Sequence, residues 1–264
     1  MFFLGSYIII GAATGLLAGL FGVGGGLIIV PALTFLFTIR GLPEPIILHL
    51  ALGTSLACIM FTSISSLRAH HGKGAVNWQV VRRISPGILV GTFLGAFLAA
   101  QLSTRFLKGV FVVFIYYVAL QMFLNTKPAP TRQLPGNSAM FGAGTLIGGI
   151  SSLVGIGGGS MSVPFLVWCN VPMHSAIGTS AAIGFPIALS GTVGYLVNGL
   201  HVAGLPSPSL GFVYLPPVLG ISVASILTAP LGARLAHSLP VVRLRMVFAL
   251  LLVAMGTKML ASIF

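Results

Sequence analysis

Long apolar segments separated by short polar breaks run along the whole chain. Each half holds four of them. We place them at roughly residues 7–38, 46–66, 84–102 and 106–124, and again at 140–170, 175–197, 212–236 and 244–263. Six of these eight segments are close to the ~20 residues that a helix needs to cross a bilayer. The pattern therefore predicts an all-α protein that lies in a membrane.

The composition agrees with a membrane protein. Of the 264 residues, 56% are hydrophobic and 5% are charged, whereas a soluble domain has about 25% charged residues. The net charge is +12, with Glu44 as the single acid. The cations are spread singly between apolar segments, as at helix ends in a bilayer, and we therefore exclude nucleic acid as a partner. The start of the chain lacks a positive region, so we expect no cleavable signal peptide.

Two motifs occur twice. The pentad Gly22–Gly26 (GVGGG) recurs as GIGGG 133 residues later, and HLALGTS at 49–55 recurs as HSAIGTS 125 residues later. A third match, between residues 107–111 and 244–248, has an offset of 137, so the length differences fall in loops near 38–45 and 199–212. We predict two homologous halves, 1–125 and 139–264, joined by a proline-containing linker at 126–138.

The first segment of each half is interrupted by its glycine pentad. In the first half, Tyr7–Phe21 would be about 22 Å long as a helix and Leu27–Thr38 about 18 Å. Neither piece would cross a hydrocarbon core of about 30 Å by itself. Each first segment is therefore either one kinked span or a re-entrant hairpin that enters and leaves on the same side.

The positions of the cations distinguish these two topologies. With a kinked span, the halves are parallel and the Lys and Arg residues divide six against seven between the two sides. With a re-entrant hairpin, the halves are inverted and the cations divide nine against four, which fits the positive-inside rule. We therefore favour an inverted repeat with six spans, two hairpins and both termini outside the cytoplasm, a common plan for transporters.

The pentads are candidate anion sites. Three consecutive glycines break a helix, and we expect new helices to begin near Leu27 and Ser160, with Pro31 and Pro164 in their first turns. A helix start offers free N–H groups and a partial positive charge, and glycine lets an anion approach the backbone closely. The candidate residues are Gly24, Gly25, Gly26, Gly157, Gly158, Gly159 and Ser160.

Close helix packing is the alternative role for these glycines. It suffices for the evenly spaced stripes Gly11/Gly15/Gly19 and Gly87/Gly91/Gly95. A nucleotide-binding loop is not supported, because neither pentad completes GxGxxG.

The HxAxGTS motifs supply further candidates: His49, Thr54, Ser55, His174, Thr179 and Ser180. The hydroxyls can bond a bound oxyanion, cap the neighbouring broken helix or bond the backbone of their own helix. The histidines can cap helix ends, contact the substrate or titrate. No Asp or Glu lies inside an apolar segment, and an acid-free interior suits an anionic substrate.

Catalysis and cofactors are not indicated. Cys58 and Cys169 each stand alone in apolar runs, and we expect both to be buried packing residues without a metal site. Paired carboxylates, a nucleophile–base signature and an ATP-binding motif are all missing from the sequence. We expect no enzyme and no cofactor. Transport would be driven by an ion gradient, the membrane potential or a partner.

The paired GxGGG and HxAxGTS motifs resemble the TauE/SafE sulfite exporter family. The segments His71–Trp78 and Leu231–Ala236 add to the resemblance, which runs from about residue 15 to 260. It implies a transporter of a bacterial or archaeal cytoplasmic membrane. The implied substrates are sulfite, sulfoacetate or taurine-related sulfonates.

Three hypotheses follow. The first is a secondary carrier that binds a small sulfur-containing anion near the midplane and works by alternating access. The second is an anion channel with the same site, and the third is a membrane enzyme or a partner subunit. The direction of transport, the coupling ion and the formation of homo-oligomers stay open.

Overall fold

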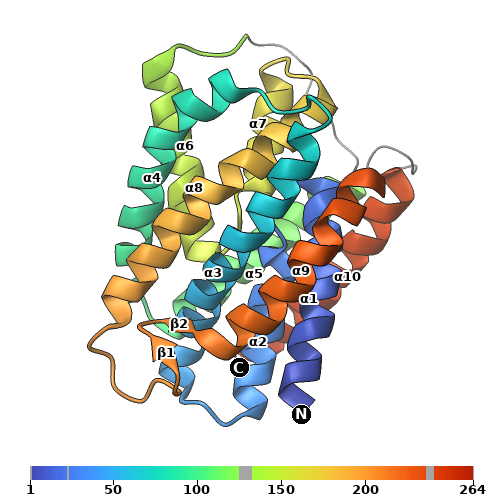
Figure 1. Ribbon diagram of the computed structural model, residues 1–264. Coiled ribbons are helices and arrows are strands. Elements are labelled where there is room, and N and C mark those ends of the chain that lie inside the picture. Colours follow the sequence, from blue (N-terminus) through green and yellow to red (C-terminus); the bar gives the residue numbers. More distant parts are fainter. Residues whose placement is uncertain (1, 23, 125–132, 236–240, 264) are drawn as a thin grey trace.

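The chain folds into a bundle of long helices (Figure 1). The structure, a computed structural model, describes residues 2–22, 24–124, 133–235 and 241–263. Most of the expected linker, residues 126–132, lies outside the described residues. The helices are α1 (Phe2–Phe21), α2 (Gly26–Ile39), α3 (Glu44–His71), α4 (Trp78–Gln101), α5 (Thr104–Phe123), α6 (Asn137–Val154), α7 (Gly159–Trp168), α8 (Met173–Gly199), α9 (Leu215–Leu235) and α10 (Val241–Ala261).

Two short strands, β1 (Ser209–Leu210) and β2 (Val213–Tyr214), pair antiparallel before α9. They lie at the place where the second half has its additional residues.

Six helices of the described chain are long and apolar enough to cross a membrane: α1, α3, α4, α5, α8 and α9. The number agrees with the prediction, but the set does not, because it includes α1. The expectation that the first piece would be too short is wrong, since α1 begins at Phe2 and its 20 residues extend about 30 Å. The apolar residues Phe2–Leu4 add the missing turn. For α10, side chains are described only from Met246 onward.

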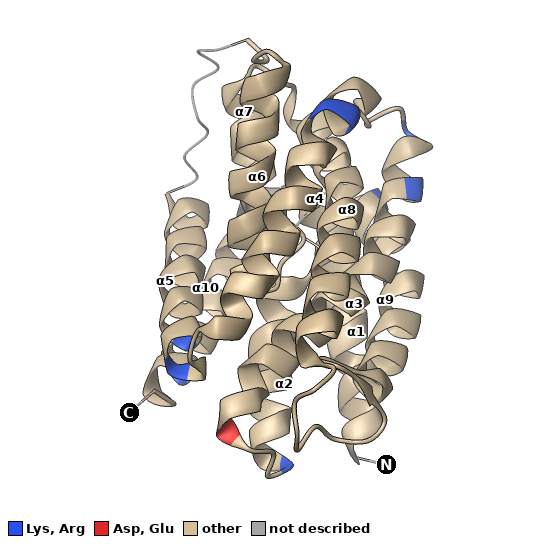
Figure 2. Cartoon of the chain, turned by 90° about the vertical axis from the view of Figure 1, so that its left-hand side faces the viewer, with Lys and Arg blue, Asp and Glu red and all other residues tan. Residues whose placement is uncertain are grey.

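The glycine breaks divide each first segment into a pair of helices. The Arg40 guanidinium after α2 lies 5.8 Å from the ring of Phe3 at the start of α1, so the chain turns back on itself. In Figures 1 and 2, α2 reaches the lower end of the molecule and α7 reaches the upper end. The two short helices therefore extend toward opposite ends of the bundle.

Helices of one half pack mainly on helices of the other half. Helix α1 lies along α9, α6 lies along α4, and α3 crosses α8. The glycine stripes make these contacts close, as predicted. A Cβ added at Gly11 would lie 2.8 Å from the Cα of Ile221, and one added at Gly144 would meet the equivalent residue, Ile84. Small residues at such positions let helix backbones approach where no hydrophobic force drives association.

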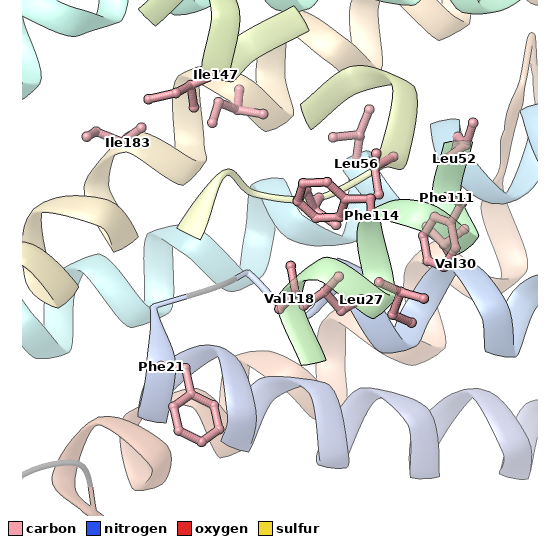
Figure 3. Packing of buried hydrophobic residues seen from close by; sticks show 14 of the residues in the cluster. Phe21, Leu27, Val30, Leu52, Leu56, Phe111, Phe114, Val118, Ile147 and Ile183 are labelled. Carbon is pink, nitrogen blue, oxygen red and sulfur yellow. The ribbon is translucent and has the colours of Figure 1, made fainter. Parts of the chain in front are cut away.

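Buried apolar side chains surround the two breaks. Leu27 and Val30 of α2 belong to one cluster with Phe111 and Phe114 of α5 and with Leu56 of α3 (Figure 3). Both Cys58 and Cys169 are buried, as expected.

The charged residues lie toward the two ends of the bundle (Figure 2). At the end that holds Arg40, the Lys108 Nζ lies 3.2 Å from a carboxylate oxygen of Glu44. At the other end, Lys73 donates a hydrogen bond to the carbonyl of Ala233. Of the cations counted in the sequence, Lys127 and Arg132 lie outside the described residues, as do the side chains of Arg243 and Arg245.

Candidate functional site

The two glycine breaks have the backbone that only glycine adopts readily. In the first, Gly24 and Gly25 both have φ of 77°, and in the second, Gly158 has φ of 73°. A side chain at these left-handed positions would strain the backbone. Helices α2 and α7 then begin at Gly26 and Gly159, one residue earlier than predicted.

The prolines that follow lie further into the helices than expected. Pro31 and Pro164 are each the sixth residue of their helix, beyond the first turn. A proline there leaves a carbonyl of the preceding turn without its usual N–H partner, and it bends the helix.

The two breaks lie against each other. A Cβ added at Gly24 would lie 3.0 Å from the Cα of Gly157, and one added at Gly26 would lie 2.8 Å from the Cα of Ile156. Neither position has room for a side chain. The structure thus brings Gly24 and Gly26 against residues 155–157 of the second break, and both helix starts are buried. Gly25 lies against Thr14 instead, and Gly158 lies against Ile187.

Each break is held by a serine from the opposite half. Ser55 Oγ donates to the carbonyl oxygen of Gly155 at 2.8 Å, and Ser180 Oγ donates to the carbonyl oxygen of Gly22 at 3.1 Å. Both serines are fully buried. Of the alternatives for these hydroxyls, the hydrogen bonds of the two serines match capping of the neighbouring broken helix. Ser180 also shares a hydrogen bond of 2.8 Å with Ser162.

The threonines of the same motifs hold loops. Thr54 Oγ1 accepts a hydrogen bond from the N–H of Tyr214 at 3.0 Å, and Thr179 Oγ1 accepts one from the N–H of Asn77 at 2.9 Å. Asn77 and Tyr214 are 137 residues apart, which is the offset of the repeat at this point. Thr54 and Thr179 are thus equivalent in contact as well as in sequence, and they fix the loops that lead into α4 and α9.

The histidines differ between the halves. His49 is buried, and its ring nitrogens lie 3.2 Å from the carbonyl oxygen of Pro45 and 3.0 Å from that of Ala99. Its ring also stacks on Phe212 at 5.3 Å. His174, in the first turn of α8, has an exposed side chain. These contacts place His49 at the start of α3, beside the end of α4.

Ser160 lies in the first turn of α7, and its buried Oγ has no hydrogen-bond partner among the described residues. Ser151 Oγ, on α6, is likewise buried and without a partner, and it lies 3.4 Å from a Cβ added at Gly158. Buried hydroxyls normally find a partner. Two unsatisfied hydroxyls beside one break therefore mark a place where a polar ligand would be stabilised.

A small cavity beside the first break is lined by two serines of α3, Ser63 and Ser66, which are not among the candidates predicted from the sequence. A signal for them was present, because residues 62–66 (TSISS) form a hydroxyl-rich run within an apolar segment. The described residues hold no group of three or more His, Cys, Asp or Glu side chains arranged to bind a metal ion.

The chain is similar to the family described as Sulfite exporter TauE/SafE over residues 7–259. It is 40% identical over 254 residues to a Haemophilus influenzae protein named "Probable membrane transporter protein", with 96% of each chain covered. A Methanocaldococcus jannaschii protein, also named a probable membrane transporter, is 29% identical over 255 residues, which cover 96% of this chain and 94% of its own. No solved structure matches the chain.

Proposed function

The chain belongs to the sulfite exporter TauE/SafE family, and we propose that it is a secondary transporter for a small sulfur-containing anion such as sulfite or sulfoacetate. The observation that carries this proposal is the contact between the two glycine breaks. It brings two helix starts, with their N–H groups and partial positive charge, into the acid-free interior of the bundle.

The proposed topology is an inverted repeat with re-entrant hairpins. Although α1 alone is long enough to cross a membrane, the return of the chain from Phe3 to Arg40 supports a hairpin α1–α2 that enters and leaves on one side. The extension of α2 and α7 toward opposite ends of the bundle supports an inverted second half (Figure 1). In this topology Arg68, Lys73, Arg82, Arg83 and Arg234 share a side. We place the protein in the cytoplasmic membrane, with this cation-rich side facing the cytoplasm.

The proposed mechanism is alternating access around the two breaks. Where the breaks meet, the backbones are too close for an open pore, because even a methyl group on Gly24 would touch Gly157. A closed contact of this kind suits a carrier that opens to one side at a time. If the halves rock, the helices that move against each other are α1 on α9 and α6 on α4, because these pairs join the two halves.

The test is flux into proteoliposomes of labelled sulfite, sulfoacetate and taurine, with sulfate and chloride as comparison anions. We expect saturable uptake and counterflow of at least one sulfur anion. Gly158→Leu should abolish it, because the variant strains a left-handed residue and fills the break. Gly41→Leu is the matched control, since Gly41 has φ of 74° and nothing lies near it.

Other outcomes would decide against parts of the proposal. Single-channel current without counterflow would replace the carrier with a channel. The absence of flux with every sulfur anion would overturn the substrate class. Normal flux in an inserted Gly158→Leu variant would overturn the assignment of the site to the glycine breaks.

A further inference from the structure

A small cavity lies against the loop that leads into α2. Its lining comes from α1, the first break, α3 and α8, through Ala18, Gly22, Gly24, Ser63, Ser66, Ala181 and Gly184. It has room for about one water-sized group. It also adjoins the second break, because a Cβ added at Gly184 would lie 3.4 Å from the carbonyl oxygen of Gly157 and 3.5 Å from the Cβ of Ser63.

Ser66 brings an unused hydroxyl to this cavity. The residue is 2% exposed, and its Oγ has no hydrogen-bond partner among the described residues. The neighbouring serines have partners, since Ser65 donates to Ile226 at 2.9 Å and Ser63 donates to Met60 at 3.0 Å. A buried hydroxyl without a partner costs free energy, and a polar ligand in the cavity would recover it.

At the equivalent place in the other half, apolar side chains take the space of the cavity, although Ser151, the counterpart of Ala18, keeps a buried hydroxyl beside the second break. By the offset of 125 residues, Leu56 and Ile59 correspond to Ala181 and Gly184, while Ala188 and Gly191 correspond to Ser63 and Ser66. Leu56 Cδ1 lies 2.7 Å from a Cβ added at Gly191, so it occupies the space that the cavity has on the other side. The polar cavity is therefore a departure from the internal symmetry.

We propose that this cavity holds one oxygen atom of the transported anion and that the Ser66 hydroxyl donates a hydrogen bond to it. The inference rests on the proposed function and identifies a specificity-determining residue within it. An anion is favoured over a cation because the start of α2 carries a partial positive charge and no acid lines the cavity. A compact oxyanion such as sulfite presents single oxygen atoms of the size that the cavity admits.

The experiment measures KM for sulfite in proteoliposomes and sulfite affinity by calorimetry on the purified protein. Ser66→Ala removes the hydroxyl and should raise KM and weaken affinity about 10- to 100-fold, as expected for a hydrogen bond to a charged group. Ser65→Ala is the matched control, because the Ser65 hydroxyl bonds the backbone of α9. It should stay within about twofold of the wild type.

A second variant tests the space rather than the hydroxyl. Gly184→Ala adds a methyl group at ordinary contact distances, so the fold tolerates it, but the methyl group stands in the cavity. It should also raise KM. Gly149→Ala is the control on α6, where an added Cβ would meet only the carbonyl of Gly91 at 3.6 Å.

The outcomes separate the two claims. If the wild type transports sulfite with saturable kinetics and both Ser66→Ala and Gly184→Ala match it, the inference is overturned and the proposed function stands. If the wild type neither binds nor transports sulfite or another sulfur anion, both are overturned. A raised KM in Ser66→Ala with unchanged controls supports the assignment.

Discussion

The two halves of the molecule hold their glycine breaks in the same way and surround them differently. In both, a serine of the HxAxGTS motif bonds the break of the opposite half, and a threonine bonds a loop N–H. Beside the breaks, Ser63 and Ser66 of α3 line a cavity, whereas their counterparts are Ala188 and Gly191. The shared hydrogen bonds hold the scaffold, and the departures from symmetry lie where we propose that the ligand is bound.

The largest effect is expected where the breaks touch. Gly24→Ala and Gly41→Ala replace glycines with nearly the same φ, 77° and 74°. Both should pay about 1–2 kcal/mol for the left-handed backbone. Only Gly24→Ala also pushes against Gly157, so it should cost about 2–3 kcal/mol more and stop sulfite flux. Thermal unfolding in detergent and flux measure both, and equal effects would contradict the close contact of the breaks.

The next largest effect is expected for the two serines that bond the break of the opposite half. Ser55→Ala and Ser180→Ala each leave a break carbonyl without its serine donor, and each should lower the free energy of unfolding by about 1–3 kcal/mol. Ser180→Ala should be the more damaging, because Ser180 also bonds Ser162. Denaturant titration of both variants gives the comparison. A negligible loss in either variant would mean that its hydrogen bond does not hold the break.

The two threonine substitutions should lower the free energy of unfolding by nearly equal amounts. Thr54→Val and Thr179→Val keep the side-chain shape and leave one loop N–H unpaired, so each should cost about 1–2 kcal/mol. The KM for sulfite should change little, because these loops lie before α4 and α9. Thr38→Val is the control, since Thr38 bonds Thr34 within its own helix. If the two losses of stability differ widely, the equivalent hydrogen bonds contribute unequally to the free energy of unfolding.

The smallest effect of the series is expected at one of the two histidines, His174. His49→Ala removes a buried ring that lies between two carbonyls and should cost about 1–3 kcal/mol. His174→Ala changes an exposed side chain and should stay within about 0.5 kcal/mol. Thermal shifts of the two variants measure the difference. A larger loss for His174→Ala would indicate a role for that histidine that its exposure does not suggest.

Much of the architecture could be predicted from the sequence. The glycine triplets predicted the breaks, since three consecutive glycines do not continue a helix. The repeated motifs predicted the two halves. The extension of α1 to Phe2 was missed because Gly5 and Ser6, residue types that are common at helix ends and turns, interrupt the apolar run that starts at Phe2. The sixth-residue positions of Pro31 and Pro164 were missed for a related reason, since helix starts are uncertain by a residue or more.

The partners of the site residues could not be predicted in the same way. A repeat shows which positions are equivalent, but it does not show whether Ser55 bonds the break of its own half or of the other. That choice follows from the packing of α3 across α8, which is set by the whole bundle. Ser66 was overlooked because a serine in a span usually bonds its own helix backbone, and only its surroundings reveal an unused hydroxyl.

The hydrogen bonds that each half's serine makes to the break of the other half also constrain the order of assembly during synthesis. A nascent chain releases α1 first, yet the hydroxyl that serves the Gly22 carbonyl lies 158 residues further on. The helix along which α1 packs, α9, is made later still. The glycine stripe of α1 and the backbone groups of the first break therefore have no packing or hydrogen-bond partner until the later helices are inserted. Ribosome pausing or truncation after α8 would leave an intermediate for quality-control proteases to recognise.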